Sequence, residues 1–113
     1  MRAEELQRVT LWFQETVNLE AEELEAWLET EESRSVGWRP DGRGESVGHA
    51  SGRRIVRILR KPEHELTDGD YQHMVRVVGF VHRHLAQRPA GDVRHTRWRH
   101  SLLDWGHDPL LSG

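Results

Sequence analysis

The 113-residue sequence contains no cysteine, and aromatic residues other than tryptophan are few, with two phenylalanines and one tyrosine. Without cysteine, disulfide bonds and thiolate zinc sites are excluded. No run approaches the roughly 18 apolar residues that a membrane-spanning helix needs, so we expect no membrane contact. The first ten residues also lack the apolar stretch of a secretory signal. These absences predict a soluble protein of the cytoplasm.

Charge is distributed unevenly along the chain, although the net charge is only −3. Residues 1–32 hold two basic and ten acidic residues, a net charge of −8, whereas residues 33–113 hold fourteen basic and nine acidic residues, a net charge of +5. All eight histidines lie in the second part. A basic region favours a polyanionic partner, but an acidic region can instead neutralise it within the fold or across a dimer. Charge alone leaves both interpretations open.

Apolar residues recur at helical spacing, so the expected fold is all-α, a single compact domain of about five helices. The longest periodic stretch is 67–88, where Thr67 and Asp70 have the spacing of a capping box and Pro89 ends the pattern. We expect it to be the central helix. The other expected elements are an acidic helical hairpin at 3–30, a Gly/Ser/Arg loop at 31–50, a basic helix at 51–61 that Ser51 caps, and a C-terminal helix at 96–105 that Gly106 ends.

The strongest candidate for a binding site is residues 44–61, in which a Gly/Ser-rich loop precedes the basic helix. N–H groups at a helix start bind anions, glycine lets backbone approach a phosphate, and arginine adds charge-assisted hydrogen bonds. We expect backbone contacts from Gly48, His49, Ser51 and Gly52, and charge from Arg53, Arg54, Arg57, Arg60 and Lys61. The alternative is a capped surface helix whose arginines lie in water or pair with the acidic N-terminal residues.

The central helix has a second face, on which residues recur at three- and four-residue steps: His73, Arg76, Phe80, Arg83, His84 and Gln87. Arg76 and Arg83 extend the basic surface if they are exposed. Gly79 costs about 1 kcal/mol relative to alanine in a helix, and such a glycine usually permits close approach of another helix or a ligand.

Five tryptophans supply much of the expected core volume. Trp12, Trp27, Trp98 and Trp105 lie on or beside apolar stripes, so we expect them to pack in the core. Trp38 lies in an Arg/Gly-rich stretch and is the one for which stacking on a nucleic-acid base stays open.

Candidate catalytic and metal-binding residues do not form a recognised pattern. Ser51, His49 and Asp68 lack a nucleophile elbow and a predicted strand to hold one. A metal-dependent enzyme could use His100, Asp104 and His107, but no HExxH or similar spacing is present. We therefore expect no enzyme, no cofactor and no metal site.

Three segments together resemble a known family: ESVGHASGRRIVRILR, LTDGDYQHMVRVVGFVHRHLAQRP and TRWRHSLLDWGHDP. They are similar to domain of unknown function 3140, a family of small proteins common in actinobacteria and often labelled DNA-binding protein. The segment AEELEAWLETEESRSVG is similar to that family's first part, so the resemblance covers roughly residues 15–110. It implies nucleic-acid binding but assigns it to no particular residue.

The leading hypothesis is therefore non-enzymatic binding of nucleic acid, chiefly DNA, through the phosphate backbone and without sequence specificity, because phosphate contacts carry none directly. The competing hypothesis is a protein–protein interaction module. In that case the acidic hairpin of one chain docks on the basic helix of another, either in a homodimer or with a separate partner.

Overall fold

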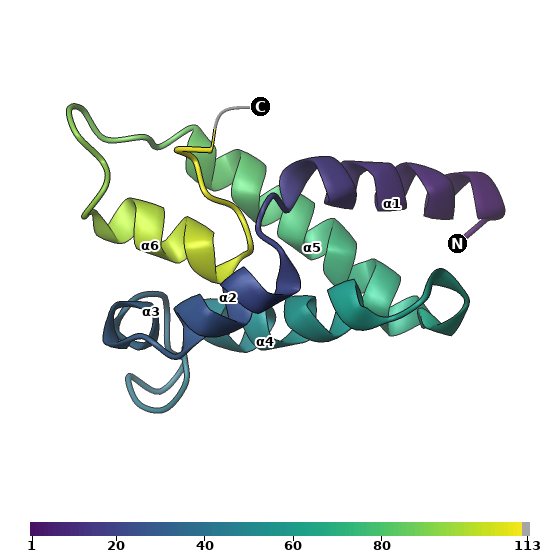
Figure 1. Ribbon diagram of the computed structural model, residues 1–113, viewed down its shortest axis with the longest axis horizontal. Helices are drawn as coiled ribbons and strands as arrows, with labels where there is room; N and C mark the ends of the chain where they lie inside the picture. Colours follow the sequence, from purple (N-terminus) through teal and green to yellow (C-terminus); the bar gives the residue numbers. More distant parts are fainter. Residues whose placement is uncertain (112–113) are drawn as a thin grey trace.

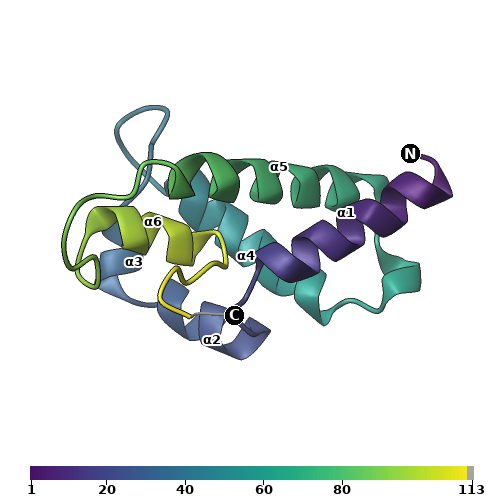
Figure 2. The same ribbon diagram turned by 90° about the horizontal axis from the view of Figure 1, so that it is seen from above.

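A computed structural model of the chain describes residues 1–111. Within that range every regular element is helical, which confirms the all-α prediction. The order is α1 (Ala3–Thr16), α2 (Ala21–Leu28), α3 (Glu31–Ser35), α4 (Val47–Arg60), a 3-10 helix η1 (Glu63–Glu65), α5 (Asp68–Leu85) and α6 (Arg97–Asp104). The loops 36–46 and 86–96 lie at one end of the molecule, opposite the N-terminus and η1 (Figure 1 and Figure 2). No helix of the described range is long and apolar enough to cross a membrane.

α5 is the longest helix of the described range, and its start is fixed by local chemistry. The Thr67 hydroxyl accepts a hydrogen bond from the Asp70 N–H at 3.1 Å, and the Asp70 carboxylate accepts one from the Thr67 N–H at 3.0 Å. This is the predicted capping box. The helix ends at Leu85, three residues earlier than expected. The residue before a proline is disfavoured in a helix, so the helix cannot continue up to Pro89. After Leu85 the chain forms a tighter turn, in which the Gln87 N–H donates a hydrogen bond to the His84 carbonyl at 3.0 Å.

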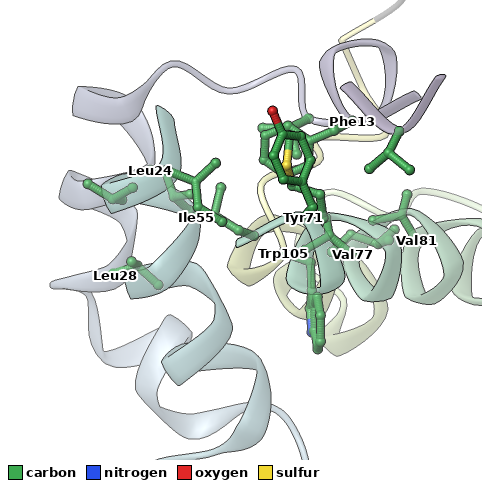
Figure 3. Packing of buried hydrophobic residues seen from close by; sticks show 14 of the residues in the cluster. Phe13, Leu24, Leu28, Ile55, Tyr71, Val77, Val81 and Trp105 are labelled. Atoms are coloured by element: carbon green, nitrogen blue, oxygen red, sulfur yellow. The ribbon is translucent and has the colours of Figure 1, made fainter. Parts of the chain in front are cut away.

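Two pairs of helices build the core, since α1 packs along α5 and α2 packs along α4, while α6 contacts α2, α3, α4 and α5. Figure 3 shows Leu24 and Leu28 of α2 on the side of Ile55 of α4, with Phe13 of α1 close to Tyr71 of α5. One apolar cluster joins both pairs.

The predicted acidic hairpin at 3–30 is wrong in its packing. Both helices are present, but α1 lies on α5 and α2 lies on α4, so the two do not pair with each other. Each has one narrow apolar stripe, which includes Phe13 in α1 and Leu24 in α2. The broader apolar faces of α5 and α4 bury these stripes more completely than the two short helices can bury each other.

The predicted loop at 31–50 is wrong at both ends. Residues 31–35 form α3, capped by the Thr30 hydroxyl, which accepts a hydrogen bond from the Ser33 N–H at 3.2 Å. α4 begins at Val47 rather than near Ser51, because the Ser46 hydroxyl accepts from the His49 N–H at 3.1 Å and caps the helix there. Either serine can cap a helix, and the earlier start gives α4 an additional turn, in which Gly48 is buried and the other residues are half-buried.

The end of α6 is tied to the link between α1 and α2. Gly106 has a φ of +80°, and its N–H donates to the Leu103 carbonyl at 3.0 Å. The His107 N–H donates to the Leu102 carbonyl, also at 3.0 Å, which completes a Schellman motif. The Gly106 carbonyl accepts hydrogen bonds from the N–H groups of Asn18 and Leu19 at 3.1 and 3.2 Å. The Asn18 side chain also bonds the Asp108 backbone, donating at 2.9 Å and accepting at 2.7 Å. Gly106 thus ends the helix as predicted and also anchors the first link of the chain.

Candidate functional site

The residues expected to form a phosphate-contacting loop lie instead in the first turns of α4, against other helices. A Cβ on Gly48 would lie 2.9 Å from Trp105 Nε1, and one on Gly52 would lie 2.5 Å from the Asp104 carbonyl oxygen. Both glycines therefore permit close approach of α4 to α6. The His49 Nε2 atom is hydrogen-bonded to the Leu28 carbonyl at 2.8 Å. These groups therefore contact the protein itself and do not form the open loop that was expected here.

Ser51 was expected in the same loop and as a helix cap, but it is buried between α4 and α5. Its hydroxyl is hydrogen-bonded to His73 Nε2 at 2.9 Å. Burial, together with the positive charges of Arg54 and Arg76, lowers the pKa of His73 to about 4, so its ring is neutral at pH 7. The pair joins two helices, and neither residue lines the cavity described below.

Two arginines of α4 are neutralised by exposed or half-buried glutamates. Arg60 forms a bidentate ion pair with Glu25 of α2, with N–O distances of 2.9 and 3.1 Å. Arg53 does the same with Glu45 in the loop before α4, at 2.7 and 2.5 Å. The Arg53 guanidinium holds the pKa of Glu45 at about 2, against the effect of partial burial. Part of the acidic N-terminal region therefore pairs with the basic helix within one chain.

Asp70, at the start of α5, neutralises two further cations of this region. Its carboxylate lies 2.7 Å from Lys61 Nζ and 3.4 Å from an Arg54 nitrogen. Burial would raise the pKa of Asp70, but the hydrogen bonds from Lys61 and Thr67 lower it well below its usual range. Arg57 is the one remaining cation of the predicted set on α4, and it has no acidic partner among the described residues. Ion pairs within the chain thus neutralise most of the basic surface predicted on α4.

Arg76 and Arg83 of α5, unlike most of the α4 cations, have no ion-pair partner within residues 1–111. Both side chains are exposed. They are seven residues apart, two turns along one helix face. Between them, a Cβ on Gly79 would lie 2.9 Å from Arg83 Nη1, so the missing side chain lets this guanidinium lie back along the helix. These two predicted charges remain available to a ligand.

Arg76 and Arg83 border a cavity of about 420 Å³ between α5, α6 and the segment that leads into α4. This volume is within the roughly 300–1,000 Å³ typical of small-molecule sites. Four rings line the cavity, those of Trp38, Phe80, His84 and Trp105. Trp105 belongs to the apolar core cluster, and Figure 3 shows its ring projecting away from Phe13 and Tyr71 of that cluster.

Three of these rings belong to one aromatic column. Phe80 stacks on Trp105 with centroids 4.3 Å apart and on His84 at 5.1 Å, and His84 lies nearly parallel to Trp98 at 6.1 Å. Trp38 takes part in no aromatic pair of the described chain and is 70% exposed. Its ring therefore has free faces beside the cavity.

Asp104 adds a buried acceptor to the cavity wall. Its Oδ1 atom accepts hydrogen bonds from Trp27 Nε1 at 2.7 Å and from the Ser33 hydroxyl at 2.5 Å. Its Oδ2 atom, equally buried, accepts none from the described residues. Burial raises the pKa of Asp104 to about 6, although the two hydrogen bonds act to lower it. An unsatisfied buried acceptor costs about 1–3 kcal/mol, so a donor delivered by a ligand is favoured there.

The three residues considered for a metal-dependent enzyme do not converge. Asp104 is engaged as described, His107 Nδ1 is hydrogen-bonded to the Thr16 carbonyl at 2.7 Å, and the His100 ring lies 5.3 Å from that of Trp27. Among the described residues no group of three or more His, Asp or Glu side chains is placed to hold a metal ion.

Sequence reasoning found part of this cavity and missed the rest. It identified the α5 face with Arg76, Phe80 and Arg83, and it left Trp38 open. Its prediction that Trp105 packs in the core is confirmed, but it did not predict that this residue also lines the cavity, and it considered Asp104 only as a metal ligand. No local signal brings these two to α5, because their partners are far away in the sequence.

Comparison with known proteins gives one match. The model of the family described as "Protein of unknown function (DUF3140)" matches residues 12–103. No curated protein and no solved structure matches the chain. The matched range contains the cavity residues from α5 and from the loop before α4, whereas Asp104 and Trp105 lie just beyond it.

Proposed function

Because the chain belongs to the DUF3140 family of proteins of unknown function, we propose its function from its own surface: non-enzymatic binding of nucleic acid in the cytoplasm, through α5. The observation that carries the proposal is the pair Arg76 and Arg83, exposed and without acidic partners in the described chain, beside an aromatic cavity. Guanidinium groups bind phosphate oxygens with two parallel hydrogen bonds, and aromatic rings stack on bases. The proposal keeps the class of function that the sequence suggested and moves it from α4 to α5.

The overall charge supports a local contact rather than a general one. A protein with a net charge of −3 does not attract a polyanion over its whole surface. On α4, most of the cations are already paired with Glu25, Glu45 or Asp70. A nucleic acid that bound there would have to displace those carboxylates, whereas Arg76 and Arg83 need no such exchange.

The test is fluorescence anisotropy with labelled duplex DNA, single-stranded DNA and RNA over a salt series. We expect the wild type to bind and its log affinity to fall linearly with log salt. Arg76→Ala/Arg83→Ala should reduce that slope by about 1.4 on a single strand or about 1.8 on duplex DNA, the values for two lost phosphate contacts. Arg76→Glu/Arg83→Glu should abolish measurable binding.

The matched control is Arg53→Glu/Arg57→Glu on α4, with circular dichroism to confirm that each variant is folded. The control should keep most of the wild-type affinity. Loss of binding in the control and not in the α5 variants would return the function to α4. Absence of wild-type binding to all three nucleic acids at low salt would refute the proposal.

A protein-interaction module is the second candidate, and one observation favours it. Leu11 and Trp12, next to each other on α1, are 57% and 51% exposed. The charge docking first considered between chains is weakened as a candidate, because Arg60 already pairs with Glu25 inside the chain. Sedimentation velocity across salt distinguishes the two modes. A dimer that dissociates with rising salt indicates charge docking, and one that persists in salt but is lost in Leu11→Ser/Trp12→Ser indicates apolar docking.

A further inference from the structure

We infer that the cavity beside Arg76 and Arg83 receives the base of one unpaired nucleotide, which stacks on Trp38 and donates its exocyclic amino group to Asp104. The inference rests on the proposed function and makes it more specific. It predicts that the nucleic acid is single-stranded, because the stacking face of a base is accessible only outside a duplex. It also predicts which bases the cavity prefers.

The side chain of Trp38 is exposed, but its backbone is held in place. Its carbonyl accepts a hydrogen bond from the Val47 N–H at 2.9 Å, so its backbone is fixed to the start of α4. The preceding Gly37 has a φ of +90°, and a Cβ there would lie 3.0 Å from the Ser46 side chain. The glycine therefore lets the chain turn closely against the helix cap just before Trp38. Because the backbone is already fixed, stacking a base on this ring has to order only the side-chain torsions.

Leaving such a ring in water forfeits much of the stabilisation that burying it would give. A tryptophan is large enough to bury about 150–250 Å², yet Trp38 is 70% exposed, whereas Trp105 across the same cavity is 5% exposed. The faces of the Phe80 ring are taken by stacking on Trp105 and His84. Trp38 is thus the ring of this cavity whose faces can accept a base.

Two residues of the cavity wall carry an acceptor and a donor that no hydrogen bond of the described chain uses. Asp104 Oδ2 accepts no hydrogen bond, and Trp105 Nε1 donates none, within the described part of the chain. The two residues meet at Gly48, where a Cβ would lie 2.9 Å from Trp105 Nε1 and 3.6 Å from Asp104 Cβ. Used together, an aspartate oxygen and an indole N–H are complementary to an amino group beside a ring nitrogen.

Cytosine and adenine present this pattern on their pairing edges, with the N4 or N6 amino group as donor and the adjacent ring nitrogen as acceptor. Thymine and uracil present the reverse, with the O4 oxygen as acceptor and N3–H as donor. An O4 oxygen placed against Asp104 Oδ2 would bring two acceptors together and leave both without a proton. The cavity should therefore favour cytosine or adenine over thymine or uracil.

The phosphate of the same nucleotide lies within reach of the α5 arginines. Arg76 and Arg83 line the same cavity as Trp38 and Asp104. A base in the cavity therefore leaves its phosphate at the rim, beside one guanidinium, with the strand continuing along α5 to the other. Free nucleotides share this chemistry, and the experiment separates them from a strand.

The experiment is competition anisotropy with oligo(dC), oligo(dA) and oligo(dT) of equal length, with CMP and UMP, and with duplex DNA. The wild type should bind oligo(dC) and oligo(dA) about tenfold more tightly than oligo(dT), which corresponds to one good base contact. The single strands should bind more tightly than the duplex. The mononucleotides should bind far more weakly than the oligonucleotides. If CMP binds as tightly as oligo(dC), a strand is excluded as the ligand and a free nucleotide takes its place.

Two variants make the test independent of folding defects. Trp38→Ala removes an exposed ring and should lower single-strand affinity about tenfold while leaving duplex affinity unchanged. Asp104→Asn keeps an oxygen for Trp27 and Ser33 and places an amide donor at the second position, so the preference for oligo(dC) over oligo(dT) should disappear or reverse.

The outcomes separate this inference from the proposed function. If Arg76→Glu/Arg83→Glu loses binding but Trp38→Ala does not, nucleic acid binds at α5 and the base cavity is refuted. If oligo(dC) and oligo(dT) bind equally while Trp38→Ala is weakened, stacking holds and the role of Asp104 is refuted. If the wild type binds none of these ligands, both the inference and the proposed function fail.

Discussion

α4 and α5 both carry arginines at helical spacing, but the surrounding chain treats them differently. The α4 arginines 53, 54 and 60 meet Glu45, Asp70 and Glu25, respectively. The α5 arginines 76 and 83 meet no carboxylate in the described residues and border an aromatic cavity instead. A run of cations on a helix is therefore not yet a basic surface. Whether it becomes one depends on which acidic side chains the fold brings beside it.

The glycines of the two helices show the same contrast. Gly52 of α4 is buried, and a Cβ there would lie 2.5 Å from a backbone oxygen of α6. A Cβ on Gly79 of α5 would meet only the end of the Arg83 side chain. α4 is covered by protein on the side where its glycines lie, whereas α5 leaves the corresponding side open.

Gly52→Val should destabilise the protein by about 3 kcal/mol, because the new side chain overlaps Leu28 and the Asp104 backbone, which cannot move away easily. Urea unfolding followed by circular dichroism measures the change. Gly79→Val is the matched control on α5 and should leave the free energy of unfolding within about 1 kcal/mol of the wild type. Equal effects at the two positions would mean that the helices are covered to the same extent.

Two buried groups at the junction of α4, α5 and α6 should oppose each other in the pH dependence of stability. The pKa of Asp104 is raised from 3.8 to about 6, so its contribution to stability is full below pH 4 and is lost as the pH rises to 6. The pKa of His73 is lowered from 6.5 to about 4, so its contribution increases over nearly the same range. Between pH 4 and pH 6.5, the free energy of unfolding should therefore increase by about 2–3 kcal/mol more in Asp104→Asn than in the wild type.

Urea titrations at the two pH values test this difference, and His73→Gln should change the slope in the opposite direction. Parallel profiles of wild type and Asp104→Asn would show that Asp104 titrates as it does in water. In that case the cavity wall is wetter than the burial of this residue indicates.

Removing the acidic partners should make α4 a binding surface. In an Arg76→Ala/Arg83→Ala background, Glu25→Gln/Glu45→Gln frees Arg60 and Arg53 while preserving side-chain shape. We expect nucleic-acid affinity to return in part, with a salt slope larger by about 1.4 on a single strand for two new phosphate contacts. Anisotropy over a salt series measures the slope. An unchanged slope would mean that something other than ion pairing keeps α4 from binding.

Gly79→Ala should have the smallest effect and should separate stability from binding. Alanine favours the helix by up to about 1 kcal/mol over glycine, so thermal unfolding should occur at a slightly higher temperature. Its methyl group would displace the Arg83 guanidinium, which lies 2.9 Å from the Cβ position, so single-strand affinity should fall two- to threefold. If affinity is unchanged, Arg83 binds without lying along the helix.

Local features could be predicted from the sequence, and distant pairings could not. The Thr67–Asp70 capping box and the Gly106 helix end each depend on residues within a few positions, and both are confirmed. The ion pair Arg60–Glu25 joins residues 35 positions apart, and the hydrogen bond from Trp27 to Asp104 spans 77. Nothing near any of these four residues indicates its partner.

The start of α4 could be predicted only in part from the sequence. Ser46 and Ser51 can both cap a helix, so local chemistry permitted either start. Gly48 and Gly52, interpreted as a flexible loop, are what α4 needs to approach α6 closely. Two glycines four residues apart indicate that something approaches the backbone closely, but the sequence does not say whether it is a phosphate or another helix.

The hydrogen bonds between residues 17–19 and 106–108 have a consequence for how the protein is made. Asn18 and Asp108 are 90 residues apart, and a ribosome that adds about 5–20 residues per second needs roughly 5–18 s to go from one to the other. During that interval the link between α1 and α2 lacks its partner, and the apolar stripes of both helices await α4 and α5. This tie therefore forms only after residue 108 has been added, and until α4 and α5 have been synthesised Phe13 and Leu24 are exposed to chaperones and to neighbouring nascent chains.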